Sequence, residues 1–208
     1  MAILMNLITN YFKNLTLIQV NQLTQLEDLY REWNQKINVI SRKDIDKIYL
    51  NHILHSLSLA KVISFKDNTT LIDVGTGGGF PGIPLAILFP NCKFHLVDSI
   101  NKKILVVNEV IKSLNLKNVI TSSDRVEKLT GKYDFVISRA VTKMAPFKKL
   151  IKGKIKKDSF NDLPNGILYL KGGDLSEELK GIPNKQYNIQ DFFKEDFFET
   201  KKIVYVKY

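Results

Sequence analysis

One stretch of the chain constrains its fold more than any other. Residues 71–82 read Leu-Ile-Asp-Val-Gly-Thr-Gly-Gly-Gly-Phe-Pro-Gly, a short apolar run followed by four glycines within five positions. A buried strand that runs into such a loop, with Pro84 in the first turn of a following helix, is typical of a ligand-binding strand–loop–helix unit. Because glycine is costly in chain entropy, this density indicates that the backbone approaches a ligand closely.

The segments after this unit alternate in character. Short apolar runs predict strands at 71–74, 93–98, 119–123, 133–138 and 166–170, and longer segments predict helices at 82–89, 101–115, 125–129 and 143–157. This alternation predicts an α/β fold with a mostly parallel, doubly wound, Rossmann-like sheet. Two aromatic-rich runs at 189–193 and 202–208 have no long helix between them, so they predict an antiparallel C-terminal hairpin at one edge.

The chain before this sheet has a helical pattern. Apolar residues recur at three- and four-residue steps over 19–38 and again over 51–63, and a polar stretch follows at 65–70. We therefore expect an N-terminal helical cap over 1–64 and a single sheet domain over 65–208.

Composition excludes several classes of protein. A single cysteine, Cys92, excludes an internal disulfide framework and a four-cysteine zinc site, and three histidines leave little for another metal site. We see no apolar run of about 18 residues and no signal-peptide pattern at the start. We expect a cytoplasmic protein that acts as a monomer, without a metal and without a membrane anchor.

The charge is strongly basic and uneven. Lys and Arg number 31 against 21 Asp and Glu, a net charge of +10, which favours an anionic partner and nucleic acid first. Seven lysines and no acid lie between Lys143 and Lys157. They form either an ordinary solvated helix face or a surface that follows phosphates, and charge alone does not separate the two.

Three ligands compete for the glycine loop. A phosphate loop of the Walker type is excluded because Phe80-Pro81-Gly82 stands where Gly-Lys-Ser/Thr is needed. A dinucleotide fits only the weak pattern Gly77-x-Gly79-x-x-Gly82. The spacing D-x-G-x-G-x-G over 73–79 is typical of S-adenosylmethionine (SAM) enzymes. Asp98, at the end of the next strand, suits the hydroxyls of a ribose.

The motifs together resemble a known family. DVGTGGGFPGIPLA, HLVDS, DRVEKL, YDFVISRA and YLKGG, with WNQKINVIS before them, resemble the RsmG family (glucose-inhibited division protein B) over roughly residues 15–175. The resemblance implies a class I SAM-dependent methyltransferase that methylates N7 of a guanine in the 530 loop of 16S rRNA. His55 stands where the family usually has Asp, and the residues after Gly173 match little.

The resemblance also implies cofactor contacts. The matching positions are Gly75, Phe80, Val126, Glu127 and Arg139. The neighbouring positions in the loop and at the strand ends complete the expected cofactor site, namely Asp73, Thr76, Gly77, Gly79, Asp98 and Ser99. We expect Arg139 to act by positioning, through the methionine carboxylate, an RNA phosphate or guanine O6.

The type of methyl acceptor leaves a trace in sequence. Cytosine C5 methylation needs a cysteine nucleophile, and Cys92 precedes a strand, away from the strand tips. Amino-group methylation commonly uses N/D-P-P-Y/F/W after the fourth strand, where this chain has Ser138-Arg139-Ala140-Val141. Guanine N7 has no proton to lose, so it needs no general base. Elimination therefore favours N7.

Basic residues at strand ends and in the lysine segment are the expected RNA contacts, namely Arg125, Lys143, Lys148, Lys149, Lys152 and Lys171. His52 fits a partly buried histidine better than a catalytic group. Two other functions stay open at this point. One is a SAM-dependent methyltransferase that acts on a small molecule, and the other is a non-catalytic module that binds SAM and RNA.

Overall fold

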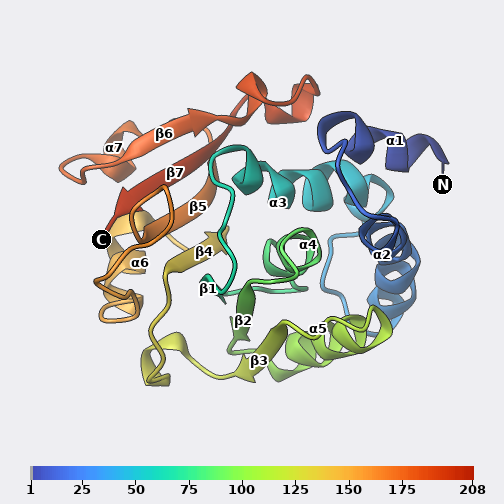
Figure 1. Cartoon of the computed structure of the whole chain (residues 1–208), viewed down its shortest axis with the longest axis horizontal. Helices are drawn as coiled ribbons and strands as arrows, with labels where there is room; N and C mark the ends of the chain where they lie inside the picture. The colour runs from blue at the N-terminus through green and yellow to red at the C-terminus, as the bar shows by residue number, and fades with distance from the viewer. Residues whose placement is uncertain (1) are drawn as a thin grey trace.

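A seven-stranded sheet forms the centre of the protein in a computed structural model that describes residues 2–208, with side chains from residue 6 onward (Figure 1). The strand order is β3-β2-β1-β4-β5-β7-β6. The strands are β1 (Thr70–Val74), β2 (Lys93–Asp98), β3 (Val119–Ser123), β4 (Phe135–Arg139), β5 (Gly166–Gly172), β6 (Lys185–Asn188) and β7 (Lys201–Lys207).

Five neighbouring strands run parallel and the last two do not. β3, β2, β1, β4 and β5 pair in parallel, whereas β7 is antiparallel to both β5 and β6. The central strands are almost continuously apolar, which suits a sheet covered on both faces. The mostly parallel α/β fold and the antiparallel C-terminal hairpin are confirmed.

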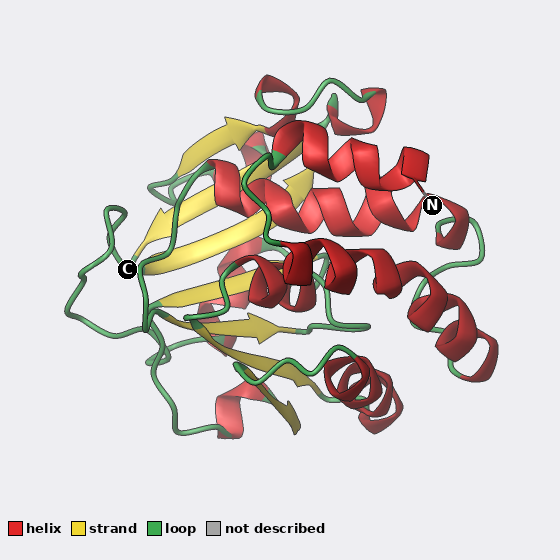
Figure 2. Ribbon diagram, turned by 45° about the vertical axis from the view of Figure 1, so that its right-hand side comes forward, coloured by secondary structure: helices red, strands yellow, loops and turns green. Residues whose placement is uncertain are grey.

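Helices cover the two faces. The α-helices are α1 (Ala2–Tyr11), α2 (Leu17–Lys36), α3 (His55–Leu57), α4 (Gly82–Leu88), α5 (Asn101–Ser113), α6 (Met144–Leu150) and α7 (Ser176–Leu179). The 3₁₀ and π-helical turns are η1 (Ile45–Lys47), η2 (Tyr49–Leu54), η3 (Ser58–Lys61), η4 (Val126–Lys128), η5 (Ile189–Asp191) and η6 (Asp196–Phe198). In Figure 2 the N-terminal helices lie together on one side of the sheet.

The N-terminal helices share their core with the sheet. Leu23, Leu26 and Tyr30 of α2 are buried in the same apolar cluster as Ile83 of α4 and Phe94 of β2. A second cluster joins β4, β5 and β7 to α6 and α7 on the opposite face. Burial of the first cluster provides the main favourable free energy that holds the cap against the sheet. Among residues 2–208, no helix is both long and apolar enough to cross a membrane.

The two helical segments expected in the cap have different structures: the first is one long α-helix, and the second is a series of short turns. α2 begins after a capping box in which Thr16 and Gln19 exchange side-chain and backbone hydrogen bonds. The segment expected as one helix over 51–63 is instead a π-helical turn, a short α-helix and a 3₁₀ turn in succession. The π-helical turn η2 brings Asn51 and His52 to Arg139 at the end of β4.

Three further expected elements differ from the structure. The helix expected over 125–129 is only the three-residue 3₁₀ turn η4. The run 189–193 begins with the turn η5 (Ile189–Asp191) and forms no strand, because Ile189 and Phe193 lie one helical turn apart and both are buried. The edge strand is β6, whose polar residues give no apolar signal. The expected helix 143–157 ends at Leu150, and the chain continues past Gly153 (φ +77°) to an isolated bridge between Ile155 and Tyr133.

Candidate active site

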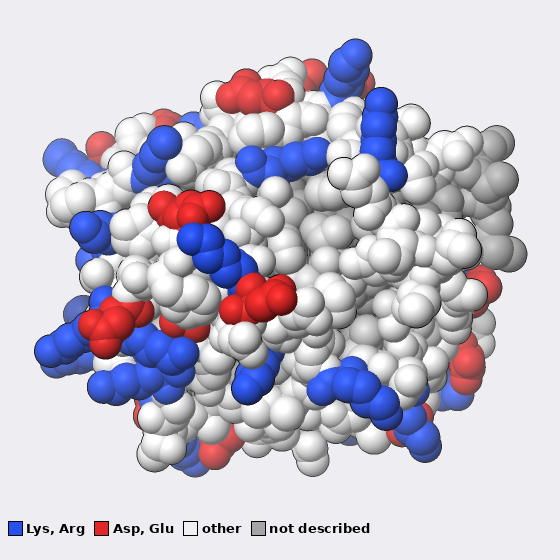
Figure 3. Space-filling model, viewed as in Figure 1, with Lys and Arg blue, Asp and Glu red and all other residues white. Residues whose placement is uncertain are grey.

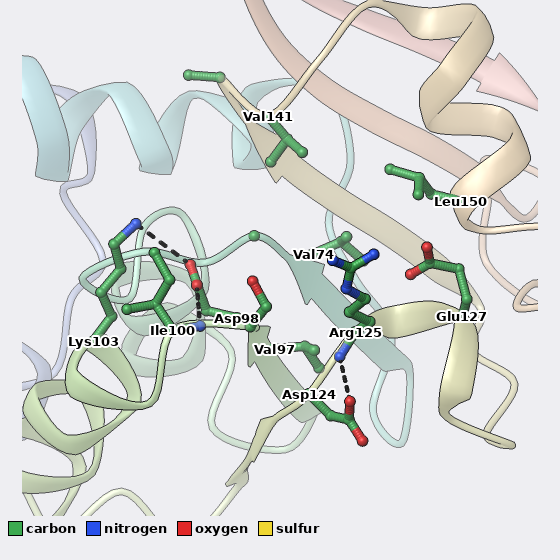
Figure 4. A pocket seen from close by; sticks show the side chains of 13 residues that line it. Val74, Val97, Asp98, Ile100, Lys103, Asp124, Arg125, Glu127, Val141 and Leu150 are labelled. Carbon is green, nitrogen blue, oxygen red and sulfur yellow. Dashed lines mark hydrogen bonds and ion pairs between the residues drawn. The ribbon is translucent and has the colours of Figure 1, made fainter.

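The carboxyl ends of β1, β2, β3 and β4 meet at one edge of the sheet, where ligands bind in open α/β folds. A cleft of about 410 Å³ opens there. Figure 4 shows its lining, with Asp98 and Lys103 on one side and Arg125 and Glu127 on the other. The cleft is lined by Val74, Gly75, Val97, Asp98, Ser99, Ile100, Lys103, Asp124, Arg125, Glu127, Ala140, Val141 and Leu150.

The glycine loop forms the floor of this cleft at Gly75. Gly75 has a φ of +68°, a conformation that favours glycine. A Cβ built on it would lie 2.3 Å from Val141 Cγ2, so another chain segment already touches the position. Glycine is therefore required here both by the backbone conformation and by the close approach of Val141.

Two carboxylates hold the loop in shape. Asp73 Oδ2 accepts hydrogen bonds from Thr76 Oγ1 (2.6 Å) and from the Gly82 amide (2.9 Å). Asp98 accepts from the Gly77 amide through Oδ2 and from the Ile100 amide through Oδ1, both at 2.9 Å. Asp98 thus links the glycine loop to the start of α5.

The environments of these two carboxylates differ. Asp73 is fully buried, and burial raises its pKa from 3.8 to about 7, against the lowering effects of its hydrogen bonds with Thr76 and Gly82 and of the charge on Arg139. Its Oδ1 atom is buried without a hydrogen-bond partner. Asp98 lines the cleft, and Lys103 Nζ lies 3.8 Å from its Oδ2 atom. These contacts favour Asp73 as an organiser of the loop and Asp98 as a residue that faces a ligand.

Arg139 lies at the tip of β4 and is held by the helical cap. Its Nη1 donates to the Asn51 carbonyl (3.1 Å), its Nη2 donates to His52 Nδ1 (2.7 Å), and its guanidinium lies 5.3 Å from the centre of the Phe80 ring. Burial lowers the pKa of Arg139 to about 10. Burial and the charge of Arg139 lower the pKa of His52 to about 3, so its ring is a neutral acceptor at physiological pH.

The expected cofactor residues divide into two groups. Gly75, Asp98, Ser99 and Glu127 line the cleft. The others lie behind it, within the loop or in the core beside it, and these are Asp73, Thr76, Gly77, Gly79, Phe80, Val126 and Arg139.

Several residues of this region are not marked as site residues by any motif in the sequence. Lys103, Asp124 and Val141 line the cleft. Tyr30 of the cap donates a hydrogen bond from its hydroxyl to the Gly78 carbonyl. The position of Asp124 directly after β3 could have identified it, because parallel strand ends converge, whereas nothing local marks Tyr30.

The lysine segment is less uniform than its sequence. Lys143, Lys149 and Lys152 are exposed and Lys148 is half-buried. Lys154 is buried and donates to the carbonyls of Leu129 and Glu127, so it belongs to the folded core rather than to a surface. Figure 3 shows basic and acidic side chains interleaved on the face that it presents.

The other two expected RNA contacts also differ from each other. Arg125 lines the cleft and is exposed. Lys171 is mostly buried, forms an ion pair with Glu178 (2.7 Å) and donates to the Thr142 carbonyl (2.5 Å).

Comparison with known proteins decides the family. Residues 19–202 match the family described as rRNA small subunit methyltransferase G. The chain belongs to this family. Proteins named ribosomal RNA small subunit methyltransferase G from Flavobacterium psychrophilum and Christiangramia forsetii are 58% and 56% identical to it. The first alignment covers 96% of each chain, and the second covers 97% of this chain and 96% of the relative.

Solved structures share the fold with this member of the methyltransferase G family. A SAM-dependent methyltransferase from Aquifex aeolicus has a TM-score of 0.57 at 17% identity, covering 80% of this chain and 98% of that one. A mutant of MtNAS in complex with S-adenosylmethionine has a TM-score of 0.58 at 13% identity, covering 91% and 76%. At these identities the likeness concerns the fold alone.

The cofactor of the family is SAM, and the residues present fit it. Gly75 offers a position without a side chain on the floor of the cleft. Each carboxylate oxygen of Asp98 accepts one amide hydrogen bond and has capacity for another, as two ribose hydroxyls require. The expected cofactor, SAM, is therefore confirmed.

Proposed function

We propose that this protein, a SAM-dependent rRNA methyltransferase by family, transfers the methyl group to N7 of a guanine in the 530 loop of 16S rRNA. The observation that carries the proposal is the cleft at the converging strand ends, with the Asp98 carboxylate on one side and the loop after β4 on the other. A ribosomal substrate assigns the reaction to the cytoplasm.

The acceptor atom is proposed from the chemistry that this site offers. Bound SAM supplies an activated methyl group, so transfer depends mainly on holding donor and acceptor in line. Cys92 is buried, and its Sγ donates to the Lys66 carbonyl (3.4 Å) next to the start of β2. Burial raises its pKa to about 11, which makes a thiolate nucleophile for cytosine C5 unsuitable.

Roles follow for the cofactor residues. We assign Asp98 to the ribose, Ser99 and Glu127 to the adenosine side of the cleft, and Gly75 to the methionine side. Val126 packs in the core behind the adenosine side. The loop residues Thr76, Gly77 and Gly79 shape the turn, with Asp73 bonded to Thr76 and Gly82 beneath it.

Arg139 is assigned a positioning role at the methionine end. Two acceptors of the cap and the face of Phe80 fix its guanidinium, which leaves further N–H donors for a carboxylate. In this arrangement the helical cap completes the site by holding a residue that the sheet supplies.

The exposed and half-buried basic residues near the site are assigned to RNA. Arg125 lies in the cleft itself, and Lys143, Lys148, Lys149 and Lys152 follow β4 along the chain. Each phosphate contact adds affinity that falls as salt rises. Substitution of one exposed lysine to Met should reduce the slope of log affinity against log salt by about one.

The decisive experiment offers labelled SAM to the purified protein with 16S rRNA, assembled small subunits and a panel of small molecules. We expect label in RNA, at a position where borohydride and aniline cleave the strand, as they do at 7-methylguanosine. Label only in small molecules would refute the RNA substrate. Label in RNA without strand cleavage would refute N7. Binding of SAM and RNA without transfer would identify a non-catalytic module.

A further inference from the structure

The loop between β4 and α6, residues 140–143, forms one wall of the cleft. It begins directly after Arg139, and both Ala140 and Val141 line the cleft. Val141 Cγ2 would lie 2.3 Å from a Cβ on Gly75, so its methyl group rests against the glycine loop. The position of this loop therefore sets the space available at the methionine end of the cleft.

This loop has an unfavourable backbone conformation. Ala140 has a φ of +55°, in the left-handed region that residues with a side chain seldom adopt. Strained positions of this kind persist when the surroundings hold them. The hydrogen bonds that hold the loop after Ala140 come from side chains of β5 and α7.

Tyr169 of β5 is the first of these holding groups. Its side chain is fully buried, and its hydroxyl accepts hydrogen bonds from the amides of Val141 (3.0 Å) and Thr142 (2.8 Å). The same hydroxyl donates to the Thr142 carbonyl (2.9 Å). A phenolic hydroxyl has one donor and two acceptor positions, so all its capacity is used on this loop.

The ion pair of Lys171 and Glu178 is the second group that holds this loop. Lys171 Nζ donates to the Thr142 carbonyl (2.5 Å) and pairs with Glu178 Oε1 (2.7 Å). Glu178 Oε1 also accepts from the amide of Met144, the first residue of α6 (2.8 Å). The side chains of Lys171 and Glu178 are only 11% and 15% exposed, so their attraction is weakly screened by solvent.

We propose that Tyr169, Lys171 and Glu178 are positioning residues for methyl transfer, acting through the loop 140–143. They fix Val141 against Gly75 and keep the backbone after Arg139 in place. The proposal rests on the proposed function, since it takes the cleft as the site of transfer. It assigns Lys171 to the loop instead of to an RNA phosphate.

Removing the positive charge of Lys171 or the negative charge of Glu178 distinguishes a phosphate contact from support of the loop 140–143. If Lys171 held a phosphate, Lys171→Met would weaken rRNA binding and reduce its salt slope by about one, and Glu178→Gln would strengthen binding. If the pair holds the loop, both substitutions impair the same step in the same direction. Tyr169→Phe, which removes only the hydroxyl, should act likewise.

The experiment measures kcat, KM for small-subunit rRNA and the salt slope of rRNA binding for these three variants. Lys180→Met, an exposed lysine just beyond α7, is the matched control and should leave all three quantities unchanged. We expect kcat to fall about tenfold or more for Lys171→Met and Glu178→Gln, with KM and salt slope within about twofold of the parent. Thermal unfolding of each variant reports whether it is folded.

Two further readouts make the result decisive. The double variant carrying both Lys171→Met and Glu178→Gln should lower kcat little beyond either single variant, because the two side chains hold the same loop and their effects are not additive. Unchanged kcat in folded single variants, or a loss confined to KM and salt slope, would overturn the proposal.

Amide hydrogen exchange tests whether these residues hold the loop without relying on rRNA methylation. The amides of Val141 and Thr142 should exchange faster in Tyr169→Phe and Glu178→Gln than in the parent. Equal protection in the parent and variants would overturn the role of these residues even if rRNA is methylated. Absence of rRNA methylation by the parent protein would refute the proposed function, and exchange would still decide whether the loop is held.

Discussion

The raised pKa of the buried Asp73 carboxyl predicts how the free energy of unfolding depends on pH. Burial raises its pKa from 3.8 to about 7 in the folded protein. The folded state therefore binds a proton more tightly than the unfolded state, and stability falls as pH rises between these two values. A difference of about three pKa units at 1.36 kcal/mol each corresponds to about 4 kcal/mol.

Asp73→Asn removes this pH dependence. The amide oxygen of Asn can still accept from Thr76 and Gly82, so the loop keeps its two hydrogen bonds. We expect the free energy of unfolding of the variant, relative to the parent, to rise by about 4 kcal/mol between pH 4 and pH 8. Urea denaturation at intervals of half a pH unit measures it.

A companion variant tests the cause. The Thr76 hydroxyl lowers the pKa of Asp73, so Thr76→Val should raise that pKa further and extend the loss of stability to higher pH. A pH-independent difference between Asp73→Asn and the parent, or a difference that falls as pH rises, would refute the assignment of a raised pKa to this carboxyl.

Two other predictions concern the cofactor loop and Arg139. Gly75→Ala should destabilise the protein by about 2–4 kcal/mol and weaken SAM binding, because it adds a clash with Val141 to the strain of a positive φ. Gly77 has a φ of +59° and open space where a Cβ would lie, so Gly77→Ala should lower the free energy of unfolding by only about 1 kcal/mol. Equal losses for the two variants in denaturation would contradict this reasoning. Arg139→Lys should lower kcat/KM for rRNA about tenfold or more, since a lysine cannot serve the two acceptors of the cap in the same planar geometry. Retained activity in a radiolabel assay would show that the charge alone suffices.

The chain order of apolar runs predicted most of the sheet. The expected strands 93–98 and 119–123 coincide with β2 and β3, and the other parallel strands differ by a few residues at their ends. The central strands are buried on both faces, so their sequences carry a strong apolar signal. β6 carries no such signal because it lies at the edge and its residues are mostly exposed.

The lysine segment shows why charge patterns mislead. Seven lysines in fifteen residues indicate a continuous basic surface, yet Lys154 is buried and Lys156 pairs with the buried carboxylate of Asp134 (3.1 Å). Lysine has a long apolar stem, so it can reach backbone carbonyls or a carboxylate from a loop near the core. Spacing along the chain does not reveal such partners.

The cofactor loop and the acidic residue after the next strand could be predicted from the amino-acid sequence alone. Those features depend on local rules, because glycines permit the turn and parallel strand ends meet at one edge. Only the tertiary structure brought Asn51 and His52 to Arg139, nearly ninety residues later in the chain, and Lys171 and Glu178 to the loop after β4. Such contacts join side chains from different elements, and packing of the cap and of β5 against the sheet decides them.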